Sequence, residues 1–76
     1  MNRIRRKELQ DILDQMAQLR DRLESVMDEE QEAYDNLPES IQDGEQGERM
    51  SNAIDCMDTA LSSMEEIEEA LTDAQE

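Results

Sequence analysis

Two stretches of apolar residues at spacings of three and four constrain the fold of this chain most. The first begins at Leu9, and no Gly or Pro interrupts it before Pro38. Read as heptads, it has Leu9, Met16 and Leu23 at a positions and Ile12, Leu19 and Val26 at d positions. This pattern predicts a helix from about residue 3 to residue 36, roughly 50 Å long at ~1.5 Å per residue.

The second apolar stretch follows Gly47 and predicts another long helix, at about residues 44–74. Its spacing is again three and four, and no further Gly or Pro interrupts it. The residues that we expect in its apolar stripe are Ile54, Met57, Leu61, Met64, Ile67 and Leu71. Methionines at such a helical spacing are typical of a packed core, with adaptable binding as the alternative.

The segment between the two stretches, about residues 37–43, reads as a hinge. Pro38 disfavours a helical conformation at the residue before it, so the first helix should end there. Residues 38–42 can form a short helical turn. Asp43, with Gln46 three residues later, resembles a capping box at the start of the second helix.

Two long helices joined by a short connection fold back antiparallel. If the hinge is centred on Ser40, the numbers of facing residues sum to about 80, which pairs Leu23 with Met57 and Val26 with Ile54. Further apolar residues flank the stripe of the first helix: Leu13, Met27 and Tyr34. This width exceeds a two-helix seam. We therefore expect an all-α, antiparallel two-helix hairpin that dimerises into a four-helix bundle.

The charge is strongly one-sided, with 22 Asp and Glu against 7 Lys and Arg and a formal net charge of −15. This balance excludes direct nucleic-acid binding by a basic face. From Met27 onward, 17 acidic residues accompany a single basic one, Arg49, which is more than solubility requires. We expect an acidic face that binds a basic protein. The residues predicted to bind are Asp55, Asp58, Glu65, Glu66, Glu68 and Glu69, with Tyr34 beside the hinge.

The sequence offers little for catalysis or cofactor binding, so we expect neither an enzyme nor a metal site. There is no His, there is one Cys, and no Gly-rich phosphate loop occurs. Aligning Gly44 with the glycine of a calcium loop puts Ile41 and Met50 where oxygen ligands are required. Cys56 reads as a small flanking residue, with an interchain disulfide as the alternative.

The basic start at residues 3–7 is not followed by the apolar core of a signal peptide. No apolar run approaches the ~20 residues of a membrane span. We therefore expect a cytoplasmic protein that does not bind a membrane.

The hinge and its flanks, residues 28–42 and then 47–50, carry a family resemblance. They resemble small acidic helical proteins of bacterial phages and other mobile elements, which are mostly uncharacterised. The resemblance implies an accessory protein that inhibits or redirects host machinery, as anti-defence proteins that block nucleases do. It supplies no catalytic or binding residues.

Our leading hypothesis is a non-enzymatic, homodimeric acidic module that binds a basic host protein, with mimicry of DNA as one form of this hypothesis. The alternative is a structural helical bundle that self-assembles within a phage or cellular particle. A third hypothesis, a subunit or chaperone-like cofactor without chemistry of its own, is not separated from the first by the sequence.

Overall fold

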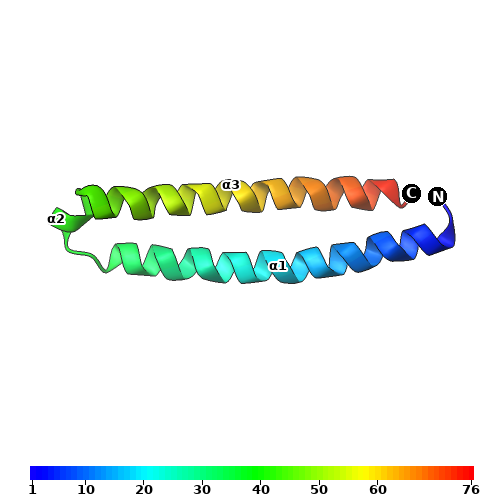
Figure 1. The fold of residues 1–76 in the computed structure, drawn as a ribbon, viewed down its shortest axis with the longest axis horizontal. Coiled ribbons are helices and arrows are strands. Elements are labelled where there is room, and N and C mark those ends of the chain that lie inside the picture. The colour runs from blue at the N-terminus through cyan, green and yellow to red at the C-terminus, as the bar shows by residue number, and fades with distance from the viewer.

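The computed structural model describes all 76 residues as two long antiparallel helices joined by a short one. The elements are α1 (Arg3–Asp35), α2 (Glu39–Gln42) and α3 (Glu45–Ala74). Helices α1 and α3 lie side by side in a rod with principal extents of 58 × 15 × 12 Å, and the two termini meet at one end (Figure 1). The predicted all-helical hairpin is confirmed.

Each end of α1 has a local cause in the sequence. The side-chain oxygen of Asn2 accepts a hydrogen bond of 2.8 Å from the backbone N–H of Arg5, which caps the first turn. At the other end the helix stops at Asp35, three residues before Pro38. Pro38 has an extended backbone (φ −56°, ψ 144°), so the chain leaves the helix and turns into α2.

The start of α3 differs from the sequence prediction. Its N-cap is Gly44, and no side chain caps the helix. Asp43 has helical angles (φ −79°, ψ −8°), and its N–H donates to the carbonyl oxygen of Glu39. The prediction of a capping box at Asp43 is therefore wrong, because this residue still belongs to the last turn of α2.

The seam, the contact between α1 and α3, is marked by half-buried residues that alternate at spacings of four and three. In α1 these residues are Leu9, Leu13, Met16, Arg20, Leu23, Met27, Glu30 and Tyr34. In α3 they are Met50, Ile54, Met57, Met64, Glu68 and Leu71, together with the buried Gly47 and Leu61. Both sets repeat every seven residues, as coiled-coil packing requires. Ala17 and Ala53, next to the seam, are also half-buried.

The predicted d positions of the first helix do not lie in this seam. Ile12, Leu19 and Val26 are 43%, 51% and 52% exposed, and Ile67 of α3 is 49% exposed. Their placement between the two helices is a wrong prediction. Leu9, Met16 and Leu23 belong to two overlapping apolar stripes, and the hairpin uses the stripe that also contains Arg20 and Glu30.

The half-buried positions give a pairing of the two helices. Matched in order from the hinge, they set Tyr34 opposite Gly47, Leu23 opposite Met57 and Leu9 opposite Leu71, so the numbers of facing residues sum to 80 or 81, close to the predicted sum of 80. The numbers of Arg20 and Glu68 sum to 88, and their two long side chains span this offset along the rod.

The hairpin has almost no interior of its own. Only 2 of 76 residues are buried, and Leu61, 7% exposed, is the single buried hydrophobic residue. Every other seam residue except Gly47 keeps part of its surface in contact with water. Two helices alone cannot enclose a core, so much apolar surface stays open on this rod.

Candidate protein-interaction surface

The seven-residue repeat divides the rest of the rod into two long sides, of two positions per helix each, and the backs of the two helices, opposite the seam. In an antiparallel helix pair, equivalent flanking positions of the two helices lie on the same side of the seam. The residues just before Leu13, Arg20 and Met27 in α1 therefore share a side with those just before Ile54, Leu61 and Glu68 in α3. The opposite flank forms the other side, and the two sides differ completely in chemistry.

The acidic side comprises the opposite flanking position of each helix and the outer position next to it. It carries 11 of the 22 acidic residues and two basic ones, Arg3 and Lys7, a net charge of −9. From α1 it takes Asp14, Asp21, Glu24, Asp28 and Asp35, and from α3 and the C-terminus it takes Glu48, Asp55, Asp58, Glu65, Glu69 and Glu76. Five further acidic residues lie on the backs of the two helices, opposite the seam: Asp11, Glu32, Glu45, Glu66 and Asp73.

Four of the predicted binding residues lie together on this side, and a fifth lies next to them. Asp55, Asp58, Glu65 and Glu69 are all exposed and follow α3 from its first half toward its C-terminal end, and the exposed Glu66 lies on the back of the same helix. No cation within α3 neutralises them, since the one ion pair along this helix joins Arg49 to Glu45 near its start.

The sequence analysis missed the contribution of α1 to the same side. Asp14, Asp21, Asp28 and Asp35 are exposed and repeat every seven residues, which places one aspartate every ~10.5 Å along a single line of the helix. The spacing itself was the available signal. This spacing indicates an acidic line beside α3 only when the seam is known, because the position of the seam determines which side of α1 faces solvent next to α3.

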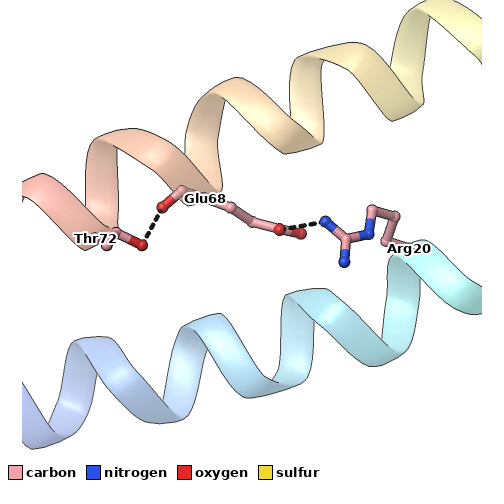
Figure 2. Close-up of polar contacts among 3 residues, drawn as sticks. All are labelled: Arg20, Glu68 and Thr72. Carbon is pink, nitrogen blue, oxygen red and sulfur yellow. Dashed lines mark hydrogen bonds and ion pairs between the residues drawn. The ribbon is translucent and has the colours of Figure 1, made fainter.

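Glu68, another predicted binding residue, lies elsewhere. Its Oε2 accepts a hydrogen bond of 2.5 Å from Arg20 Nη1 across the seam, and its backbone oxygen accepts one from the Thr72 hydroxyl (Figure 2). The side chain is only 17% exposed, and Oε1 has no hydrogen-bond partner. Glu68 therefore holds α1 and α3 together and is turned away from the acidic side.

Tyr34 is likewise a residue of the seam, half-buried in the last turn of α1. Its backbone oxygen accepts a hydrogen bond of 2.9 Å from Gln42 Nε2, which ties the end of α1 to α2. The structure thus places Tyr34 beside the hinge as predicted, at a distance along the rod from the acidic residues of α3.

The apolar side, defined here by two rows of residues, is nearly neutral. The inner row contains Ile12, Leu19, Val26 and Ala33 of α1 with Ala53, Ala60, Ile67 and Ala74 of α3. The outer row contains Glu8, Gln15, Arg22 and Glu29 of α1 with Arg49, Cys56, Ser63 and Ala70 of α3. With Arg5, which continues the inner row, this side has a net charge of +1.

The surface has no feature typical of a small-molecule site. Its one hollow is open and is lined by four residues from successive turns at the start of α1: Ile4, Lys7, Glu8 and Asp11. No group of three or more His, Cys, Asp or Glu side chains is arranged to hold a metal ion. None of the helices is apolar over a length that would cross a bilayer. Cys56 is a free, exposed thiol.

These features define a class by geometry: an acidic helical hairpin with one long side that carries no excess of negative charge. No family model, curated protein or solved structure matches the chain. The function is therefore inferred from the arrangement of its own residues.

Proposed function

We propose that this chain is a non-enzymatic protein-binding module whose acidic side docks on the basic surface of a nucleic-acid-binding protein. The observation that carries the proposal is the uneven distribution of charge, with −9 on the acidic side and −5 on the adjoining backs of the helices, against +1 on the apolar side. A charge that served only solubility would be mixed in sign and spread around the rod. An excess of one sign on contiguous faces is typical of electrostatic recognition.

The linear charge density supports a partner that normally binds nucleic acid. A net charge of −15 over 58 Å is one charge per about 4 Å, and two copies side by side carry one per about 2 Å. Duplex DNA carries one per ~1.7 Å. A homodimer of this rod therefore presents nearly the charge density that a basic nucleic-acid channel accepts.

The proposed biological setting is a bacterial host cytoplasm, with the module encoded by a phage or another mobile element. This part of the proposal rests on the resemblance of residues 28–42 and 47–50 to small acidic phage proteins. In that setting the module acts as an inhibitor that occupies the basic surface of a host protein, for example an anti-defence protein directed at a nuclease.

Affinity capture from a bacterial lysate, followed by elution with duplex DNA, tests the proposal. The immobilised chain should retain a basic protein that DNA releases. Replacing Asp58 and Glu65 with Lys on the acidic side should abolish retention, because it changes the charge there by +4. Glu39→Lys with Asp43→Lys, at exposed positions of the hinge outside both sides, makes the same change in charge and should retain the protein.

Two results would count against the module. Retention unaffected by the Asp58 and Glu65 substitutions would remove the acidic side from the proposal. Recovery of the chain alone would favour the alternative function, a self-assembling structural bundle. The observation that favours this alternative is the exposed apolar side, which a bundle of several copies would cover.

A further inference from the structure

The apolar side leaves large hydrophobic residues in water along much of the rod. Ile12, Leu19 and Val26 are 43–52% exposed, and Ile67 is 49% exposed on the neighbouring helix. They lie on one side of the seam, so they form a single stripe rather than scattered contacts. We infer that this apolar side is the interface for a second copy of the chain, packed face to face as a four-helix bundle.

The distribution of charge favours a second copy of the chain as the partner that covers the apolar side. Two copies with a net charge of −15 each repel one another, and contact through the acidic side would bring −9 against −9. Contact through the apolar side brings +1 against +1, with Arg22 available to pair with Glu8 or Glu29 of the other copy. This is the only side on which a second copy meets no excess of like charge, and a strongly basic partner finds little there to bind.

The available area matches what a stable dimer needs. A side of 58 by 15 Å presents roughly 870 Å², against ~800 Å² per partner in a standard protein interface. A single hairpin also needs such an interface to bury its apolar residues, because only 2 of its 76 residues are buried. Small scaffolds of this kind gain their missing core by association.

The side chains of the two helices differ in size in a way that suits a second copy. In the inner row α1 contributes Ile12, Leu19 and Val26, whereas α3 contributes mostly alanines. The outer row of α3 is also small, with Cys56, Ser63 and Ala70. Stacking α1 of one copy on α3 of the other sets large residues against small ones, and both contacts are then antiparallel when the two hinges lie at the same end.

Sedimentation equilibrium of the full chain, with circular dichroism, tests the interface. The unsubstituted chain should sediment as a dimer of 8.8 kDa subunits. Leu19→Glu should weaken the dimer at least about 100-fold, since the dimer would bury a carboxylate from each copy. Gln18→Glu is the matched control, because the neighbouring residue adds the same charge on the back of α1, outside the apolar side, and should change the dissociation constant less than about 3-fold.

A second pair of variants addresses the case in which Leu19→Glu unfolds the hairpin. Ala60→Glu on the apolar side should dissociate the dimer, whereas Thr59→Glu, one residue away on the outer surface of α3, should not. A monomeric unsubstituted chain at millimolar concentration would overturn the inference, and so would equal effects within each pair. The lysate capture is independent of this result, because it reads binding through the other side.

Discussion

The two ends of the rod are held by different kinds of contact. At the hinge end, Gly47 packs so closely on Gln42 that a Cβ at Gly47 would overlap the carbonyl oxygen and lie 2.5 Å from the carbonyl carbon. The side chain of Gln42 also bonds the backbone of Tyr34. At the open end, the cations of residues 3–7 lie near the acidic C-terminus of α3 (Figure 1), yet no ion pair joins them.

This difference shows which features determine how the hairpin closes. The hinge contact leaves no freedom, because backbone atoms cannot move aside as a flexible side chain can. The open end has only weak, screened attraction between exposed charges. Between them, one ion pair in the middle of the seam, Arg20 with Glu68, is the only polar bond between the side chains of α1 and α3. Substitutions should therefore lose effect from the hinge toward the termini.

The largest effect is expected at Gly47. Gly47→Ala should destabilise the hairpin by about 2–3 kcal/mol, because the new Cβ must push α2 away from α3. For a chain of this size the melting temperature should fall by roughly 10–20 °C, which a thermal scan by circular dichroism measures. Gly44→Ala is the matched control. Its Cβ would meet Ile41 O at 3.4 Å, an ordinary contact, so its effect should stay within about 0.5 kcal/mol.

Equal losses of stability in Gly47→Ala and Gly44→Ala would contradict the expected difference between the two ends of the rod. They would mean that helix propensity, rather than the contact with Gln42, determines the loss of stability at Gly47. A Gly47→Ala variant as stable as the original chain would show that α2 can shift without consequence.

A smaller effect is expected at the ion pair in the seam. Arg20→Leu should cost about 1–2 kcal/mol, because it leaves the mostly buried carboxylate of Glu68 without its only partner. The double variant Arg20→Leu, Glu68→Leu should be at least as stable as the original chain, since it extends the apolar seam. Urea unfolding of both single variants and the double variant forms the cycle that measures this coupling.

A double variant no more stable than Arg20→Leu alone would show that the pair contributes nothing beyond packing. A double variant that is stable but no longer unfolds in one cooperative transition would sharpen the comparison. It would mean that the ion pair selects the register of the two helices, which a seam of leucines and methionines leaves open.

Local signals were sufficient to predict the helices of this chain. Pro38, the glycines and the uninterrupted apolar repeats place the ends of α1 and α3 within one residue of the observed Asp35 and Glu45. The short helix α2 also falls where a turn at residues 38–42 was expected. Each of these features depends on the backbone preference of a few neighbouring residues, which the sequence displays directly.

Local signals could not predict which side of each helix faces the seam. Leu9, Met16 and Leu23 are consistent with a seam that includes either Ile12 or Leu13, and hydrophobicity favours the stripe with no charged residue. The hairpin uses the other stripe because Arg20 and Glu68 satisfy one another across the seam. That compensation joins residues 48 positions apart. The missed aspartates of α1 follow from the same choice.

The smallest effect is expected at the open end. Replacing Arg5 and Arg6 with Gln should change the free energy of unfolding by less than about 0.5 kcal/mol, because neither guanidinium is paired with a C-terminal carboxylate. Two weak terms oppose each other. The variant loses attraction to the acidic end of α3, and it also relieves an unfavourable placement of cations at the N-terminus of α1. Urea unfolding at low and physiological salt measures both terms.

A loss above about 1 kcal/mol that disappears in salt would show that ion pairs close the open end in solution. The two ends would then be held comparably, and the termini would take part in fixing the hairpin. A result near zero at both salt concentrations would instead leave α2 and Gly47 as the contacts that close the rod. The control is Arg22→Gln, which removes an unpaired cation away from that end.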